Sequence, residues 1–167
     1  TRNINYMLKN TGNGPVKFLI SVPFTAAFAK KQVGSERKDI DSIENTILIN
    51  GSSLRAVTKE RMWDKDHMLY THIYYNAKKA QGIREDLYAT VALLRQKAIA
   101  NPEKCLDDEE CQKYLIIRKS EKQSNGYTIS IRTDVIEQSL QTAGWVVLIS
   151  NVISDAQKAM GIYRDKD

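Results

Sequence analysis

The chain has 167 residues, of which 42% are hydrophobic and 27% are charged. This ordinary globular balance excludes a disordered chain, and the length suits one domain, or one domain with a small appendage. The net charge of +5 comes from 25 Lys and Arg against 20 Asp and Glu. Such a modest basic excess is compatible with binding to polyanions without requiring it.

Neither a signal peptide nor a membrane partner is expected. The first residues contain no long apolar stretch, and no apolar run approaches the roughly 20 residues of a membrane span. Cys105 and Cys111 lie in the acidic stretch "EKCLDDEEC". A disulfide-built secreted domain normally carries more cysteines, and no His lies nearby to complete a zinc site. One disulfide stays open as an alternative, but free thiols in a cytoplasmic protein are the favoured interpretation.

The N-terminal segment predicts a short helix followed by a strand. Ile4, Met7 and Leu8 share one face at helical spacing. The turn residues at 12–15 end this helix. The continuous apolar run at 16–24, "VKFLISVPF", has strand length and predicts a strand buried on both faces.

The next segment predicts a helix and then a pair of strands. Thr25 could cap a helix that runs through Lys31. Residues 42–49 fit either a helix or a strand. The Asn-Gly pair at 50–51 predicts a tight turn. Residues 53–63 and 67–76 are rich in Val, Thr, Tyr and Ile, which predicts a hairpin closed by the "DKD" between them.

The clearest helix is predicted at 82–101, where apolar residues recur at helical spacing and acidic residues occupy the expected first turn. The apolar residues are Ile83, Leu87, Val91, Leu94 and Ala98. Asn101 and Pro102 stop this helix, and the acidic stretch that follows could form a short surface helix. Paired strands are predicted at 114–120 and 126–134, and a helix that ends at a glycine is predicted at 134–144.

The last two elements are a strand and a helix. Residues 145–151, "WVVLISN", have the composition of a buried strand, and Ser154 could cap a helix that follows. The element order shows neither strict βαβ alternation nor a repeat. We therefore predict an α+β fold with a mostly antiparallel β-sheet and flanking helices.

Motifs of catalysis are scarce. The chain has no glycine-rich phosphate loop, no GxSxG and no metal-binding His/Cys cluster. His67 and His72 lie five apart in a strand-like segment, so they should point to opposite faces, and a structural or solvent-facing role is favoured. The acids of "DKDH" and "DDEE" are adjacent in loops, where carboxylates are usually solvated, whereas metal sites need acids from separate elements.

Two basic clusters are more informative. The first comprises Lys30, Lys31, Arg37 and Lys38, and the second comprises Arg55, Lys59, Arg61 and Lys65. The second cluster ends beside Trp63, which could stack on an extruded base while the cations hold phosphate. The alternative, which the residues alone favour, is a solvated strand face with a core Trp. Trp145 is expected in the core.

The segment "GWVVLISN…SDAQKAMGIYRDKD" resembles the end region of the DDE transposases of bacterial insertion sequences. In that family a strand, a short acidic turn and a helix with the signature Y-x2-R-x3-E follow one another. The residues that match the strand are Gly144, Trp145, Leu148 and Asn151. Tyr163 matches the Tyr of the signature, and Lys166 stands where Arg is usual, which keeps the positive charge. The Glu of the signature would fall three residues beyond Asp167.

Two further segments resemble the same family in the same order. "NINYMLKN…VKFLISVP" looks like the segment after the second catalytic Asp, which would lie just before Thr1. "HMLYTHIYYNAKKAQGIREDLYATVALLRQK" is similar to the middle of these proteins. Each motif is degenerate, so the resemblance rests on their appearing in register over most of the chain.

The resemblance implies an RNase H-like catalytic core in which two Asp and one Glu hold two divalent metals, Mg²⁺ or Mn²⁺, that cut and rejoin DNA ends. Residues 1–23 and 143–167 would belong to this core, and residues 24–142 would form a β-rich insertion domain. The three carboxylates would lie outside the sequence, so the piece alone should have no catalytic residue, metal ligand or cofactor. The parent enzyme would act in the cytoplasm, as a dimer on double-stranded DNA.

The DNA-binding residues expected within this piece are Tyr163, Lys166, Trp63, Arg55, Lys59 and Arg61. A different class of function also stays open at this point. The chain could be a stand-alone small basic domain that binds nucleic acid or a protein partner.

Overall fold

The structure is a computed structural model that describes residues 2–9, 16–122 and 126–165. The chain divides into two compact units. The first comprises residues 1–77 and 144–167, and we call it the sheet unit. The second comprises the intervening residues, and we call it the hairpin unit.

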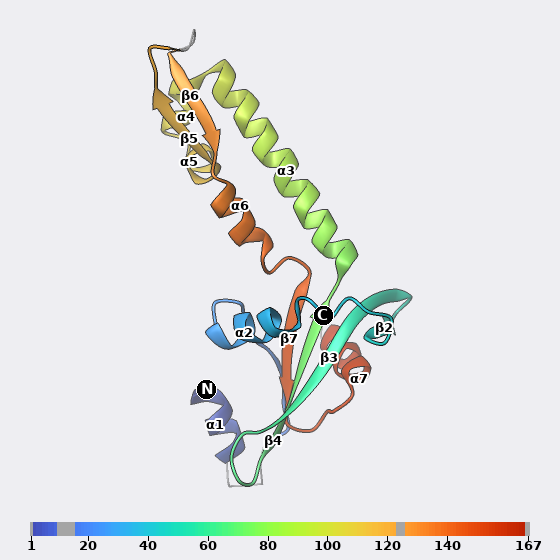
Figure 1. Cartoon of the computed structure of the whole chain (residues 1–167). Coiled ribbons are helices and arrows are strands. Elements are labelled where there is room, and N and C mark those ends of the chain that lie inside the picture. The colour runs from blue at the N-terminus through green and yellow to red at the C-terminus, as the bar shows by residue number, and fades with distance from the viewer. Residues whose placement is uncertain (1, 10–15, 123–125, 166–167) are drawn as a thin grey trace. The chain divides into compact units, whose positions relative to one another are not determined.

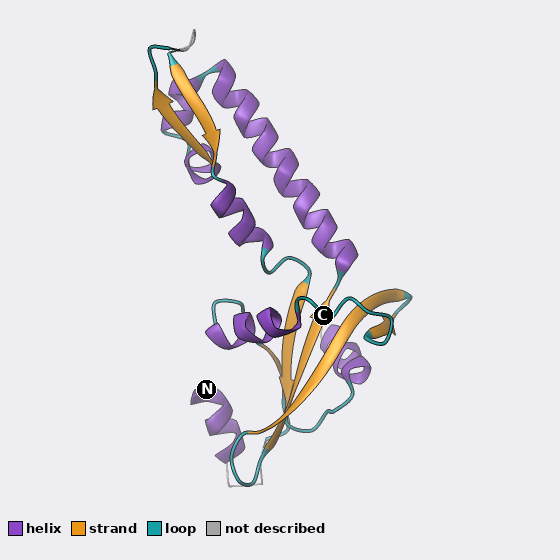
Figure 2. Cartoon of the chain, viewed as in Figure 1, coloured by secondary structure: helices purple, strands orange, loops and turns teal. Residues whose placement is uncertain are grey.

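The sheet unit is built on a five-stranded antiparallel sheet with the strand order β1-β7-β4-β3-β2 (Figures 1 and 2). The strands are β1 (Leu19–Ser21), β2 (Thr46–Ile49), β3 (Ser52–Met62), β4 (Met68–Tyr75) and β7 (Trp145–Ser150). The edge strand β1 and its neighbour β7 come from opposite ends of the chain. The prediction of an α+β fold with a mostly antiparallel sheet is confirmed.

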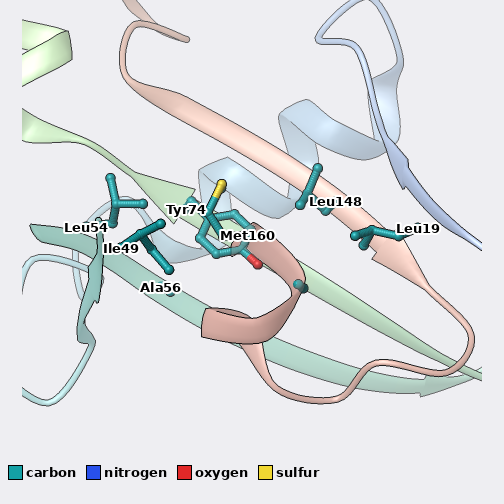
Figure 3. Packing of buried hydrophobic residues seen from close by; sticks show 8 residues of the cluster. Leu19, Ile49, Leu54, Ala56, Tyr74, Leu148 and Met160 are labelled. Atoms are coloured by element: carbon teal, nitrogen blue, oxygen red, sulfur yellow. The ribbon is translucent and has the colours of Figure 1, made fainter. Parts of the chain in front are cut away.

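Helices cover both faces of this sheet (Figure 1). They are α1 (Arg2–Lys9), α2 (Ala27–Glu36) and α7 (Ala156–Arg164). Successive side chains of a strand point to opposite faces. On one face, Leu148 of β7 packs in a cluster with Met160 of α7 (Figure 3). On the other face, Val147 packs in a cluster with Val33 of α2, and Leu8 of α1 belongs to a neighbouring cluster.

Several local predictions for the sheet unit are confirmed. The segment at 145–151 forms the buried strand β7, which lies between β1 and β4. Strands β3 and β4 form the predicted hairpin. Asn50 and Gly51 adopt φ angles of 48° and 74°, the left-handed pair that a type I′ turn requires. Residues 46–49, within the segment left open between helix and strand, form β2.

The segment at 16–24 differs from its prediction. It contributes a strand of only three residues, at the edge of the sheet, and Ser21 is exposed. Phe18 and Leu19 are buried because helix-lined clusters enclose them on the two faces. Burial on both faces thus holds for Phe18 and Leu19, whereas the strand is shorter than predicted and Ser21 is exposed. Pro23 has no N–H to extend the ladder.

The predicted helix caps are also wrong. The helix α2 begins after Ala26, no side chain caps it, and Thr25 lies outside it. The cap of α7 is Asp155, whose carboxylate accepts a hydrogen bond from the N–H of Lys158 at 2.6 Å, and not Ser154. In both cases the helix begins one residue later than predicted.

The hairpin unit consists of four helices and a β-hairpin within its described residues (Figure 2). Its elements are α3 (Ala77–Ala100), α4 (Pro102–Leu106), α5 (Glu109–Tyr114), β5 (Leu115–Lys119), β6 (Tyr127–Ile131) and α6 (Thr133–Leu140). The predicted pair of strands is confirmed as β5 and β6. One apolar cluster joins α3 to the hairpin and to α6, with Leu94, Leu115 and Ile136 among its members.

The helix α3 is longer than predicted. It begins at Ala77 and passes through Gly82, so Glu85 and Asp86 lie inside the helix and not in its first turn. Ile83, expected on the buried face, is 38% exposed. The predicted burial holds further along the helix, at Val91, Leu94 and Ala98. The earlier start follows from the good helix formers before the glycine.

The acidic stretch after α3 is helical, as predicted, but it is not only a surface element. Cys105 of α4 and Cys111 of α5 are fully buried in the apolar cluster, and both are free. Their sulfur atoms lie 2.8 Å apart. Burial raises the pKa of the Cys111 thiol to about 12. The pair is therefore a packing element of the hairpin unit.

The predicted boundaries at 23/24 and 142/143 separate a catalytic core from an insertion domain, as in the family that the sequence resembles. The division into compact units does not test them, so they stay a prediction. Three strands of the predicted insertion, β2, β3 and β4, share one sheet with β1 and β7.

Candidate nucleic-acid interface

The cations predicted on β3 lie on one face of the sheet, because they occupy alternate positions. The Nε of Arg55 lies 2.9 Å from a carboxylate oxygen of Asp41. Lys59 forms an ion pair with Glu36 of α2 and a hydrogen bond of 2.9 Å to Ser35. Arg61 is exposed and forms no ion pair with another described residue. Two of the three predicted phosphate contacts are thus engaged inside the protein.

Trp63 is neither a core residue nor a free stacking platform. Its half-buried ring packs against the apolar cluster that includes Leu8 of α1 and Phe18. Its indole N–H donates a hydrogen bond of 2.6 Å to the side-chain oxygen of Asn5. Its backbone N–H donates to the carbonyl of His67 at 2.8 Å, which closes the β3–β4 turn. Trp63 therefore joins the β3–β4 turn of the sheet unit to α1.

Tyr163 lies on α7 and is half-buried. Its ring packs against the cluster formed by Leu148 and Met160 with their neighbours. Lys166, the second residue carried over from the signature, lies outside the described residues. The helix presents Tyr163 toward the sheet, and this orientation depends on the buried Ala159 and Met160 beside it.

The predicted site residues are not brought together. The β3 cations and Trp63 belong to the face covered by α1 and α2, whereas Tyr163 packs on the opposite face with α7. The alternation of side chains along a strand could not have predicted this separation. The face on which α7 packs depends on the β7–α7 connection, whose path the sequence does not specify. The predicted set therefore splits into two separate surfaces.

The connection between β7 and α7 is fixed by side-chain hydrogen bonds to backbone. Asn151 accepts from the N–H of Phe18 at 2.9 Å and donates to the carbonyl of Val16 at 3.0 Å. The Ser150 hydroxyl donates to the carbonyl of Phe18 at 2.9 Å and accepts from the N–H of Ile153 at 3.0 Å. These bonds tie the segment before β1 to the segment before α7.

His72 supports the same connection from β4. Its Nδ1 lies 2.8 Å from the Thr58 hydroxyl, and its Nε2 lies 3.0 Å from the carbonyl oxygen of Ile153. Because a carbonyl only accepts, we assign the hydrogen to Nε2 and let Nδ1 accept from Thr58. Burial lowers the pKa of His72, while the bond to Ile153 and the charge of Asp155 oppose this shift. His72 is thus a buried, neutral side chain that links β3 and β4 to the β7–α7 connection. His67 lies before β4 and contacts the Asp64 carboxylate.

A second tie to α7 comes from Tyr74. Its hydroxyl donates a hydrogen bond of 2.8 Å to the carbonyl of Ala156, the first residue of the helix. Burial raises the pKa of this hydroxyl well above its ordinary value, so it stays protonated and able to donate. The start of α7 is thus held from β4 and β7 together.

The first basic cluster, which the predicted site did not include, is the more open one. Lys30 and Lys31 of α2 and Lys38 after it are exposed. Arg37 is also exposed, and its guanidinium lies 5.5 Å from the centre of the Trp145 ring, which is buried as predicted. The signal in the sequence was the clustering of four cations within nine residues.

Among the described residues, no three His, Cys, Asp or Glu side chains converge in a way that could hold a metal ion. The resemblance places the carboxylates of the two-metal centre outside this sequence, so we derive no step through that centre. No helix in the described part of the chain is long and apolar enough to cross a membrane. No protein-family model, curated protein or solved structure matches the chain.

Proposed function

We propose that this chain is the region of a DDE transposase between its second catalytic Asp and its catalytic Glu. The observation that carries the proposal is the pairing of β1 with β7, locked by Asn151. The two segments that resemble the catalytic core of that family lie far apart in sequence, yet they are neighbours in the sheet. Their pairing is what the proposal expects of two segments that belong to one core.

In this proposal, the hydrogen bonds around the β7–α7 connection position the helix that carries the active-site signature. Ser150, Asn151 and His72 fix the chain before α7, and Asp155 caps the helix. Tyr163 would then contact a DNA phosphate near the scissile bond, together with Lys166. The remaining RNase H-like strands would add to the outer edge of β1, which pairs with no other described strand.

The coding sequence around the chain gives the most direct test. We expect an Asp codon shortly before Thr1 and a Glu codon three positions after Asp167. A reading frame that starts at Thr1 and stops after Asp167 would contradict the proposal.

A second test uses the protein of the complete reading frame. We expect Mg²⁺- or Mn²⁺-dependent cleavage at transposon ends, and its loss when the Glu is replaced by Gln. Tyr163→Phe keeps the buried ring and removes only the hydroxyl, so cleavage should fall by about 10-fold to 100-fold. The thermal midpoint should stay close to that of the wild type. A cleavage rate unchanged by Tyr163→Phe would remove the assigned phosphate contact.

The second candidate is a stand-alone nucleic-acid-binding domain. The exposed lysines of α2 favour it, because they do not depend on any catalytic residue. The reading frame separates the two candidates, since the second requires no flanking carboxylates.

A further inference from the structure

The outward side of α2 carries a row of positive charges. Lys30, Lys31 and Lys38 are exposed, and none of these three forms an ion pair with another described residue. At 100° per residue, Lys30, Lys31 and Arg37 fall within an arc of about 120° on the helix, and Lys38 follows directly after it. The backbone of Arg37 is still helical, with φ −53° and ψ −34°. We call these four cations, together with Gly34, the α2 stripe.

Gly34 lies at the centre of this arc. A Cβ atom added at Gly34 would meet no atom within 4 Å, and the residue is exposed. Packing therefore gives no reason for a glycine, which is a poorer helix former than alanine. A helix without a Cβ at this point lets the backbone of a partner come close. Both observations, the cations and the glycine, mark the same side of α2.

Two acids beside the stripe form ion pairs with β3 cations. Glu36 is bound by Lys59, and Asp41 is bound by Arg55. Asp39 leaves one exposed negative charge beyond Lys38. Arg55 and Lys59, two of the three β3 cations predicted to bind DNA, thus neutralise acids beside the stripe, which keeps its positive charge.

We propose that the α2 stripe docks on the phosphate backbone of duplex DNA, with Gly34 at the point of closest approach. From Lys30 to Arg37 the stripe extends about 10 Å, and duplex DNA presents one phosphate per about 3.4 Å of each strand. The stripe therefore faces about three phosphates. Within residues 27–38 no large apolar side chain is exposed, so an anchor of the kind that protein partners use is absent there. The choice of DNA rests on the proposed function, whereas the position of the surface rests on α2.

The test measures binding of the whole chain to a short duplex of random sequence at several salt concentrations. Each lost phosphate contact lowers the slope of log K against log[salt] by about 0.9. The variant Lys30→Gln, Lys31→Gln and Lys38→Gln should lose a slope of about 2.7, so the drop in affinity between about 50 and 200 mM salt should shrink by about 40-fold. An unchanged slope would overturn the proposal.

Gly34→Gln tests the close approach separately. Gln is a better helix former, so the thermal midpoint should rise by about 2–4 °C, while DNA affinity should fall by about tenfold. The matched control is Gly82→Gln in α3, because Gly82 is also an exposed helical glycine with no atom within 4 Å of an added Cβ. The control should be more stable and bind DNA like the wild type. Equal binding by both variants would overturn the role of Gly34.

A rescue experiment separates counter-ions from direct contacts. Lys59→Gln should weaken DNA binding because it frees the charge of Glu36 beside the stripe. Adding Glu36→Gln should restore the affinity. Failure of the rescue would show that Lys59 itself holds phosphate.

The same measurements distinguish the two proposals. DNA binding that ignores every α2 variant overturns the docking surface and leaves the transposase proposal standing. Stripe-dependent binding in a protein whose reading frame lacks the flanking carboxylates overturns only the transposase proposal. No binding of the wild type at about 50 mM salt, or equal binding to polyglutamate, overturns the docking surface.

Discussion

The sheet unit and the hairpin unit depend on contacts of different range. In the sheet unit, β1 pairs with β7, so that Leu19 lies opposite Ser150, and Asn151 binds backbone groups near the start of β1. In the hairpin unit, β5 and β6 are consecutive strands, and the paired thiols of Cys105 and Cys111 are six residues apart. The sheet unit therefore depends on pairing between strands from opposite ends of the chain, whereas the strand pair of the hairpin unit joins segments close in sequence.

The two units also differ in charge. The sheet unit holds 14 Lys and Arg against 10 Asp and Glu, a net charge of +4, and the hairpin unit holds 11 against 10, a net charge of +1. The basic excess of the chain thus belongs to the unit that carries the α2 stripe. We therefore expect nucleic acid to bind to the sheet unit and not to the hairpin unit.

The largest expected effects come from truncating one core residue in each unit. Leu148 and Leu115 are at most 2% exposed, so each change to Ala should cost about 2–5 kcal/mol. Hydrogen exchange should show lower protection in the sheet unit for Leu148→Ala and in the hairpin unit for Leu115→Ala. If either variant lowers protection in both units equally, the two unfold together and the comparison fails.

The next largest effect separates a long-range tie from a local cap. Asn151→Ala removes two hydrogen bonds to backbone and should cost about 1–3 kcal/mol, with faster exchange at the amide of Phe18. Asn101→Ala removes only the 3.4 Å cap of α4 and should cost less than about 1 kcal/mol. Denaturant unfolding compares them. Equal losses would mean that Asn151 adds nothing beyond a local turn.

A pH dependence just below neutrality should be confined to the sheet unit. Because burial lowers the pKa of His72, its neutral form stabilises the fold fully above the ordinary pKa of about 6.5. This stability is lost as the pH falls below that value toward the folded pKa. The hairpin unit contains no histidine. We expect the protection factors of the sheet unit, which are exchange rates corrected for the intrinsic pH dependence of amide exchange, to fall on acidification across this window.

Two variants isolate the histidine responsible. His72→Gln should remove the pH dependence, and His67→Gln, outside the sheet at an exposed turn, should keep it. Persistence of the dependence in His72→Gln would assign it to another group.

The smallest effect is expected at the ion pairs. Arg55→Ala removes a partly exposed pair with Asp41 and should change the free energy of unfolding by no more than about 1 kcal/mol. Thermal unfolding measures it, and Lys65→Ala, at a fully solvated pair, serves as the control. A loss well above that of other surface variants would make Arg55 a structural residue and not a counter-ion.

Local patterns predicted much of the fold. The β3–β4 hairpin, the turn at 50–51 and the burial of Val91 and Leu94 follow from signals within a few residues. The strand predicted at 16–24 was too long, because an apolar run has the same sequence pattern whether strands or helices cover it. The predicted DNA contacts on β3 could not be judged, since Glu36 and Asp41 reach them only through the folding of α2 and the chain that follows.

By itself, the sequence determined the elements, the basic excess and the order of the family-like segments, because each depends on neighbouring residues or on composition. Only the tertiary structure decided that Trp63 and Tyr163 lie on opposite faces of one sheet. It also decided which cations are paired, leaving Lys30, Lys31 and Lys38 without an ion pair among the described residues. Face and pairing depend on strand register and helix cover, which join residues that the chain keeps far apart.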